Sequence, residues 1–317
     1  MAATDLPTLS CWVASQGLIG LQNQAEGLAR ALGFPFTIKE FKKPRGWRPW
    51  PLPPEKYGFL PPWPDVLITC GCQSAGLSVA VRRASQGKTF TIHIQDPAMA
   101  PKHFDVVVAP SHDKVRGENV FVSQGSVHHV TLEKLKEAAD HFRPLLGRLP
   151  RPLVSVLVGG SNRHQDFSTV IARDLAGKLL AAAKASGGGL AVSPSRRTGA
   201  ANEALLRQEL RAVPSYIWDG SGENPYFGLL GLGDAIVVTS DSVSMISEAC
   251  SSGKPVYIYE LPNAGKRHKI FLESFIRQGL VRLFKGSIEP WEATALNETQ
   301  KAVDFIRLRL KERWGRT

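Results

Sequence analysis

Short apolar runs alternate along the chain with longer segments in which apolar residues recur every three or four positions. Runs that are apolar throughout are typical of strands buried on both faces of a sheet, and the longer period is typical of helices. The runs predict strands at 9–14, 36–41, 65–69, 89–94, 104–109, 120–122, 153–158, 190–193, 215–218, 235–238 and 256–259. The longer segments predict helices at 21–32, 75–85, 166–185, 200–212, 245–252, 265–278 and 294–314.

The order strand, helix, strand favours parallel sheets, because two parallel neighbours need a crossover connection. A basic, proline-containing stretch at 142–152 separates the two series of strands and is typical of a linker. We therefore expect an α/β protein with two Rossmann-like domains facing a cleft. The first domain is predicted at 1–147 and the second at 151–290.

The composition excludes several classes of protein. The chain has 317 residues, 43% of them hydrophobic and 21% charged, which suits a globular protein with ample core. No apolar run approaches the roughly 20 residues of a membrane span, and the first residues lack the pattern of a secretory signal. Four scattered cysteines favour free thiols in a reducing compartment. These features predict a cytoplasmic protein.

The net charge of +11 predicts an anionic partner, such as a nucleotide or an anionic membrane surface. No nucleic-acid-binding module is recognisable, so we expect no nucleic acid partner. The irregular stretch 42–64 combines basic residues with Trp47 and Trp50. Tryptophan beside basic residues suits a membrane interface or the rim of a substrate site, although such a loop also packs onto its own domain.

The stretch 234–262 carries the clearest candidate chemistry. It predicts a buried strand, a turn rich in hydroxyl groups, a short helix and a second buried strand. The first turn of a helix attracts phosphate through its unpaired N–H groups, and a carboxylate one turn further on suits a ribose diol. The serines of the turn are equally suited to capping the helix, so both interpretations stay open.

Other strand ends in the second half add groups suited to a nucleotide diphosphate. Two glycines and a serine offer backbone donors at 159–161, and adjacent arginines offer charge at 196–197. A tyrosine at 226 suits stacking on a base. The predicted donor site comprises Gly159, Gly160, Ser161, Arg196, Arg197, Tyr226, Ser240, Ser242, Ser244 and Glu248.

The first half carries a predicted acceptor side and a general base. Asp96 is the first candidate base and His93 the second, although Asp96 before a proline suits an Asx-turn and His93 suits a core position. The histidines show no metal-ligand spacing, so we expect neither a metal nor a cofactor. The predicted acceptor-side residues are Gly17, Gly20, Gln22, Gln73 and Gln95.

Several motifs carry a resemblance to known families. Ser247-Glu248 followed by Gly253-x-Pro255 is similar to the donor-nucleotide motif of GT-B glycosyltransferases. Nearly the whole chain resembles the mitochondrial-fission (elongated mitochondria) family in its bacterial-type members, on the segments 17–24, 95–97, 157–162 and 193–198. The resemblance implies a GT-B-like fold in which the C-terminal helix, within 294–317, crosses back to the first domain.

Three functions are consistent with this resemblance, and the fold alone does not separate them. The first is metal-independent transfer of a sugar from a nucleotide-diphosphate sugar to a lipid or glycan acceptor. The second is a non-catalytic adaptor that recruits a dynamin-like GTPase to a membrane. The third is nucleotide-sugar epimerisation. The adaptor function implies a peripheral position on a membrane, which is the outer mitochondrial membrane in a eukaryote.

Overall fold

The computed structural model describes residues 9–42, 51–162 and 165–315, so Trp47 and Trp50 lie outside the described residues. The chain divides into two compact units. The first unit comprises Met1–His129 and Asn297–Thr317, and the second comprises Val130–Leu296. None of the described helices is both long enough and apolar enough to cross a membrane.

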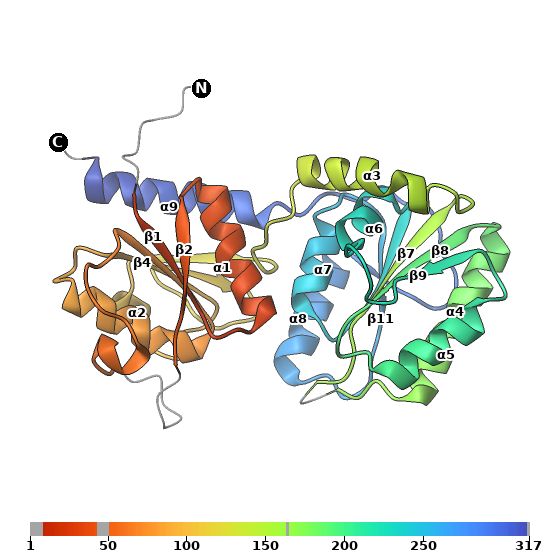
Figure 1. Cartoon of the computed structure of the whole chain (residues 1–317), viewed down its shortest axis with the longest axis horizontal. Helices are drawn as coiled ribbons and strands as arrows, with labels where there is room; N and C mark the ends of the chain where they lie inside the picture. Colours follow the sequence, from red (N-terminus) through yellow and green to blue (C-terminus); the bar gives the residue numbers. More distant parts are fainter. Residues whose placement is uncertain (1–8, 43–50, 163–164, 316–317) are drawn as a thin grey trace. The chain divides into compact units, whose positions relative to one another are not determined.

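In its described residues, the first unit contains a parallel sheet of six strands in the order β2-β1-β3-β4-β5-β6 (Figure 1). The central strands are buried throughout, as their uninterrupted apolar sequences predict. The strands are β1 (Cys11–Ser15), β2 (Phe36–Glu40), β3 (Val66–Cys70), β4 (Phe90–Ile94), β5 (Val106–Pro110) and β6 (Val120–Ser123).

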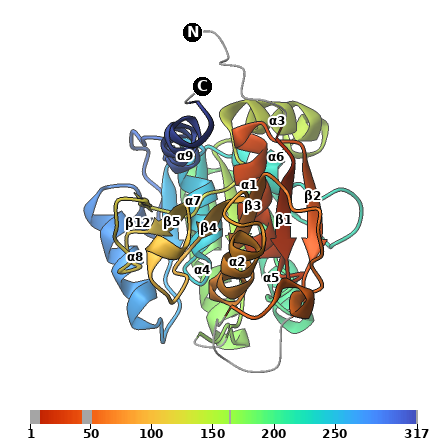
Figure 2. The ribbon, with the colours of Figure 1, turned by 90° about the vertical axis from the view of Figure 1, so that its left-hand side faces the viewer.

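Helices cover both faces of this sheet (Figures 1 and 2). Helices α1 (Ile19–Leu32) and α9 (Glu298–Trp314) pack side by side on one face. Helix α2 (Cys72–Ala84) packs on β3 and β4 from the other face. Two short 3-10 helices, η1 (Pro54–Tyr57) and η2 (Pro101–His103), lie in the connecting segments.

Helix α9 belongs to the first unit although it lies at the far end of the sequence. Its apolar stripe, with Ala302, Ile306 and Leu310 fully buried, joins the core that α1 shares with the sheet. At its start, the Glu298 carboxylate accepts a hydrogen bond from the Gln124 backbone at 2.7 Å. The predicted return of the C-terminal helix is therefore confirmed.

In its described residues, the second unit contains another parallel sheet of six strands, in the order β12-β11-β10-β7-β8-β9. The strands are added in one direction from β7 to β9 and in the opposite direction from β10 to β12. This order matches the doubly wound pattern of Rossmann-like folds. The strands are β7 (Leu153–Val158), β8 (Gly189–Pro194), β9 (Ser215–Ile217), β10 (Ala235–Thr239), β11 (Val256–Tyr259) and β12 (Arg282–Leu283).

Two apolar cores sandwich this second sheet. Helices α4 (Thr169–Ser186) and α5 (Ala200–Leu210) pack on one face. The other face carries α3 (Leu132–Leu146), α6 (Tyr226–Leu232), α7 (Val243–Cys250) and α8 (Lys266–Arg277) (Figure 1).

Helix α3 is the main element that is absent from the predicted helices. It is capped by Thr131, whose side chain accepts from the Lys134 backbone at 3.1 Å, and it continues through Pro144. Phe142 is buried and lies so close to Gly228 that a β-carbon there would come within 2.6 Å of its ring. The stretch 142–152 therefore begins inside a packed helix, and the second unit starts upstream of the predicted linker.

The attachment of α9 gives a direct stability prediction. We expect Ile306→Ala to lower the free energy of unfolding by about 2–4 kcal/mol, because it removes fully buried methyl groups and leaves a cavity. Leu308→Ala on the same helix is the matched control, since Leu308 is 56% exposed and should cost less than about 0.5 kcal/mol. Urea unfolding followed by circular dichroism measures both. Equal losses for the two variants would contradict the packing described for α9.

Candidate functional site

The loops that follow β7, β8, β10 and β11 leave the second sheet at one edge. Because these strands are parallel and paired in register, their carboxyl ends lie together. This edge brings together the predicted glycine loop at 159–161, the arginine pair at 196–197 and the serine turn at 240–244. It is referred to below as the carboxyl edge of the second unit.

The serines of the turn after β10 have different environments. Ser240 is fully buried, and its hydroxyl accepts from the Leu261 backbone at 2.9 Å, so it does not face a ligand. Ser242 is the N-cap of α7 and accepts from the Met245 backbone at 3.3 Å. Ser242 and Ser244 are half-buried. Helix capping therefore accounts for the oxygen of Ser242. Ser242 and Ser244 both lie at the start of α7.

The backbone donors of the glycine loop all have acceptors within the chain. Gly159 N–H donates to the Thr239 hydroxyl at 2.7 Å, and Gly160 N–H donates to the Asp241 carboxylate at 3.1 Å. Ser161 N–H donates to the Arg197 carbonyl at 3.2 Å. The N–H groups of the loop that was predicted to bind a phosphate are thus already hydrogen-bonded within the chain. The Asp241 carboxylate accepts from one of them, as a phosphate oxygen would.

Asp241 organises this part of the edge. Its side chain is fully buried and accepts from the Thr239 hydroxyl at 2.7 Å and from the Arg197 guanidinium at 2.7 Å. A β-carbon on Gly159 would meet both carboxylate oxygens at 2.2 Å, and one on Gly160 would meet the Arg197 carbonyl at 1.9 Å. Internal packing is therefore sufficient to require glycine at both positions.

The two arginines after β8 differ in their contacts. Arg197 is held by Asp241 and also donates to the Gly160 carbonyl at 3.3 Å, yet 40% of its side chain stays exposed. Arg196 is exposed at the same edge. Both guanidinium groups therefore offer N–H donors to solvent, and Arg197 does so from a fixed position.

Glu248 lies on α7, buried, and its carboxylate accepts a hydrogen bond from the Tyr226 hydroxyl. Burial raises the pKa of Glu248 from 4.5 to about 7, while the Tyr226 hydrogen bond and the charge of Lys134 act in the opposite direction. Burial and the neighbouring carboxylate raise the pKa of Tyr226 well above its usual value. The structure thus pairs two predicted residues that come from separate helices.

His268, at the start of α8, was not predicted. Its Nε2 contacts the Ser240 carbonyl, and its pKa is lowered by burial, an effect that the Ser240 carbonyl and Asp241 oppose. It therefore lies beside the Asp241 cluster. The signal in the sequence is Lys266-Arg267-His268-Lys269, four basic residues at a helix start, where the helix dipole disfavours positive charge.

The acceptor-side residues of the first unit lie at or near the carboxyl ends of β1, β3 and β4. Gln22 accepts from the Ser15 hydroxyl at 2.6 Å, and Gln95 donates to Gln24 at 3.3 Å. Gln73 is exposed on the first turn of α2, and Gly17 and Gly20 are exposed around the start of α1. Gly17 has a φ of +75°, which favours glycine there.

The two candidate bases have different surroundings. His93 is fully buried in β4, contacts the Thr69 hydroxyl at 2.8 Å, and burial lowers its pKa to about 3. It is therefore a neutral core histidine, and the geometry does not support it as a base that contacts an acceptor. Asp96 is half-buried and accepts from the Ala98 backbone at 2.8 Å in an Asx-turn. Its backbone N–H donates to the Asp113 carboxylate at 3.1 Å.

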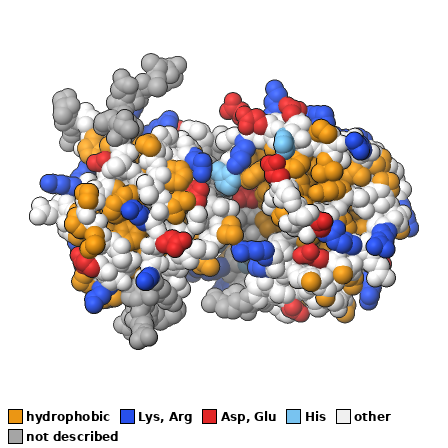
Figure 3. All heavy atoms as spheres, viewed as in Figure 1, with side chains coloured by type: hydrophobic (Ala, Val, Ile, Leu, Met, Phe, Trp, Pro, Cys, Tyr) orange, Lys and Arg blue, Asp and Glu red, His pale blue; other side chains and the backbone are white. Residues whose placement is uncertain are grey.

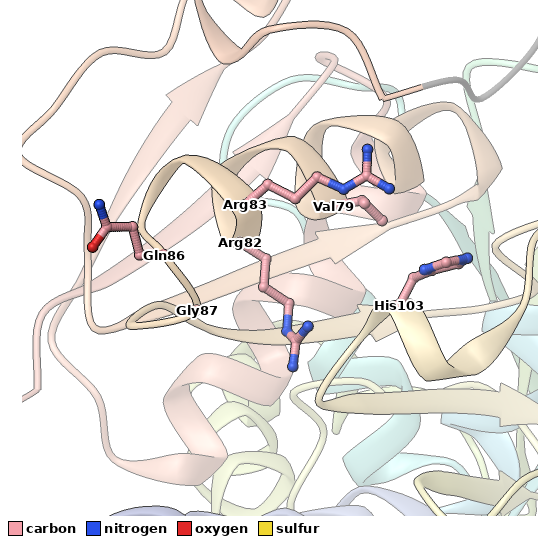
Figure 4. Close-up of a pocket in the computed structure, with 6 residues that line it drawn as sticks. All are labelled: Val79, Arg82, Arg83, Gln86, Gly87 and His103. Atoms are coloured by element: carbon pink, nitrogen blue, oxygen red, sulfur yellow. The ribbon is translucent and has the colours of Figure 1, made fainter.

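A pocket of about 260 Å³ lies on the first unit, near the C-terminal end of α2 (Figure 4). It contains three basic side chains, those of Arg82, Arg83 and His103. Arg82 is held by two hydrogen bonds to Asp105 at 3.0 and 3.1 Å. Basic residues in the last turn of a helix also complement its dipole, so the structure alone explains this cluster.

The described residues contain no group of three or more His, Cys, Asp or Glu side chains placed to hold a metal ion. In Figure 3, lysine and arginine side chains are spread over the visible face of both units, with aspartate and glutamate among them. On this face the basic side chains are therefore not gathered in one patch.

Solved structures of other proteins identify the class of fold. MurG of Acinetobacter baumannii aligns with 94% of this chain and 99% of its own, at a TM-score of 0.55 and 14% identity. UDP-GlcNAc 2-epimerase of Methanocaldococcus jannaschii, in complex with UDP-GlcNAc and UDP, aligns with 94% of this chain and 98% of its own, at a TM-score of 0.56 and 12% identity. The protein therefore has the GT-B-like fold that the sequence predicted.

The chain belongs to the mitochondrial fission ELM1 family, whose sequence model matches residues 19–310. The mitochondrial fission protein ELM1 of Arabidopsis thaliana is 32% identical to it, over 79% of this chain. The match spans 65% of the length of the plant protein. The family resemblance drawn from the sequence is confirmed.

The buried carboxylate of Glu248 predicts a pH-dependent stability. Between about pH 4.5 and about pH 7 the folded protein keeps a proton on Glu248 that the unfolded chain has lost, so the free energy of unfolding falls as the pH rises through this window. Glu248→Gln removes this loss, which amounts to about 3 kcal/mol at roughly 1.4 kcal/mol per pH unit. We expect the stability of the variant relative to the wild type to be about 3 kcal/mol more favourable at about pH 8 than at about pH 4.5.

Urea unfolding at the two pH values measures this difference. Glu273→Gln, an exposed position on α8, is the matched control and should leave the pH dependence unchanged. If wild type and Glu248→Gln differ in the free energy of unfolding by the same amount at both pH values, Glu248 does not keep a proton in the folded protein over this window.

Proposed function

We propose that the protein binds a nucleotide-diphosphate sugar at the carboxyl edge of the second unit and transfers the sugar to a lipid or glycan acceptor. The observation that carries the proposal is the convergence at one sheet edge of the exposed Arg196 and Arg197 with the start of α7. Ligands of open α/β sheets bind at this edge. The complex of the Methanocaldococcus jannaschii epimerase with UDP-GlcNAc and UDP supports a nucleotide sugar as the ligand class.

Each donor-site residue has a role in this proposal. Arg196 and Arg197 hold the diphosphate through guanidinium forks, and Ser242 and Ser244 donate to it at the helix start. Glu248 accepts from the ribose hydroxyls, which replace the Tyr226 hydroxyl as its donors. The freed Tyr226 contacts the base. Gly159 and Gly160 keep the loop close to Asp241 and do not contact the ligand through their N–H groups.

The proposed transfer needs no metal. The acceptor oxygen loses its proton to the Asp96 carboxylate and attacks the anomeric carbon. The bond from that carbon to the diphosphate oxygen breaks, and the diphosphate leaves with the electron pair, stabilised by the arginines and the helix start. Gly17, Gly20, Gln22, Gln73 and Gln95 form the acceptor side on the first unit in this proposal.

The second candidate is the non-catalytic adaptor, which recruits a dynamin-like GTPase to a membrane. The N–H groups of the glycine loop already donate to acceptors within the chain. This favours the adaptor, because a chain that binds no diphosphate does not need these N–H groups for a ligand. The name of the plant relative, a mitochondrial fission protein, points in the same direction. Both candidates place the protein in the cytoplasm, with the adaptor peripheral on a membrane.

Ligand-induced stabilisation tests the choice. UDP-GlcNAc at about ten times its dissociation constant stabilises a folded protein by about 1.4 kcal/mol, which for a domain of this size raises the melting temperature by about 3–5 °C. We expect this shift with at least one of the UDP-, GDP-, ADP- and CMP-sugars. We expect Glu248→Ala to abolish it, because the ribose loses its acceptor.

Glu273→Ala, exposed on α8, serves as the control and should retain the full shift. The shift with ligand is compared within each variant, so a lower melting temperature of Glu248→Ala does not affect the result. If none of the four classes of nucleotide sugar shifts the wild-type melting temperature, the glycosyltransferase proposal fails and the adaptor is favoured.

A further inference from the structure

Asp241 occupies a position that suits a phosphate oxygen. Its carboxylate lies among three donors of the kind that bind phosphate in nucleotide sites: a loop N–H from Gly160, a hydroxyl from Thr239 and a guanidinium from Arg197. The three donor–acceptor distances are 3.1, 2.7 and 2.7 Å, which are normal lengths for hydrogen bonds. The carboxylate is fully buried and satisfied, so it is part of the folded edge.

The surrounding backbone is shaped to admit this carboxylate. Gly159 is required because a β-carbon there would overlap both oxygens of Asp241 at 2.2 Å. Gly160 is required because the Arg197 carbonyl passes within 1.9 Å of the position of a β-carbon. The features that predicted a phosphate cradle from the sequence are therefore accounted for by an internal anion and the arginine that binds it.

We infer that the Asp241 carboxylate occupies an anion subsite formed by the Gly160 N–H, the Thr239 hydroxyl and the Arg197 guanidinium. Its negative charge thereby sets the affinity of the carboxyl edge for phosphate. In the folded protein Asp241 neutralises Arg197, so an external phosphate reaches only the outer N–H groups of that guanidinium and is repelled by the carboxylate behind it. The inference rests on the proposed function in one respect, namely that the external anion is the diphosphate of a nucleotide sugar.

Asp241→Asn tests the inference because it keeps the shape of the side chain and removes its charge. We expect the affinity for inorganic pyrophosphate, measured by isothermal titration calorimetry on the full chain, to rise by about tenfold or more, since a negative charge beside the ligand is lost. The affinity for UDP should rise in parallel. Added salt should reduce the gain, because the interaction is electrostatic.

Asp166→Asn is the matched control. Asp166 also lies at this edge, where it accepts from the Ser161 hydroxyl at 3.0 Å, but it is exposed and does not bind Arg197. Its replacement should leave the pyrophosphate affinity within about threefold of wild type. A gain equal to that of Asp241→Asn would assign the effect to net charge alone and overturn the inference.

Arg197→Gln keeps the inference testable if asparagine at 241 lowers stability. In the wild type this change should weaken pyrophosphate binding by about tenfold, because it removes a guanidinium that binds the anion and leaves the negative charge of Asp241 uncompensated beside it. In the Asp241→Asn background it should remove the gain. An affinity unaffected by Arg197→Gln in the wild type, or an unchanged or weaker affinity in a folded Asp241→Asn variant, would overturn the inference.

The two ligands separate this inference from the proposed function. If pyrophosphate gains affinity in Asp241→Asn while UDP binds to neither protein, Asp241 fills an anion subsite but the nucleotide proposal fails. If UDP binds to the wild type and Asp241→Asn leaves both affinities unchanged, the nucleotide proposal stands and the role of Asp241 is refuted.

Discussion

The buried carboxylate of Asp241 is the constraint on which the functional edge of the second unit depends. It draws Arg197, Thr239 and the Gly160 amide together, and it lies in space that any side chain on Gly159 would fill. A buried charge is tolerated only when it is fully hydrogen-bonded, and Asp241 meets that condition with donors from three separate loops or strands. The positions of the loops after β7, β8 and β10 are thereby linked.

The fold was predictable because its strongest signals are periodic. Uninterrupted apolar runs such as Leu153–Val158 became fully buried parallel strands, and the stripe containing Ile306 became the buried face of α9. Helix α3 was missed because Pro144, in a basic stretch, indicated a linker, whereas burial of Phe142 against α6 outweighs the cost of the proline. The cap residue Thr131 and the helical spacing of Leu135, Ala139 and Phe142 were local signals of this helix, whereas its continuation past Pro144 depends on tertiary packing.

That the candidate residues of the second unit gather at one sheet edge was predictable, but their contacts were not. The turn at 240–244 and the loop at 159–161 do meet at one edge, as the strand order required. Residue types alone did not reveal that Ser240 faces inward or that Asp241, between two predicted phosphate-binding serines, binds the loop. The available signal was Asp241 itself, an acidic residue within a predicted phosphate site. The start of α7 favours a negative charge, and a carboxylate of the chain can supply that charge as readily as a bound phosphate.

Glu248 and Tyr226 bear on the choice between an enzyme and an adaptor. A carboxylate buried deeply enough to have a pKa of about 7 lowers the stability of the folded protein near neutral pH. Packing explains the glycines at 159 and 160, so they give no evidence of a ligand. Packing does not explain the buried ionisable pair of Glu248 and Tyr226, because an apolar pair of similar volume would fill the same space without lowering the stability. Local costs of this kind are expected where a site serves a ligand. The unexplained cost therefore lies at Glu248, the residue to which the proposed function assigns the ribose.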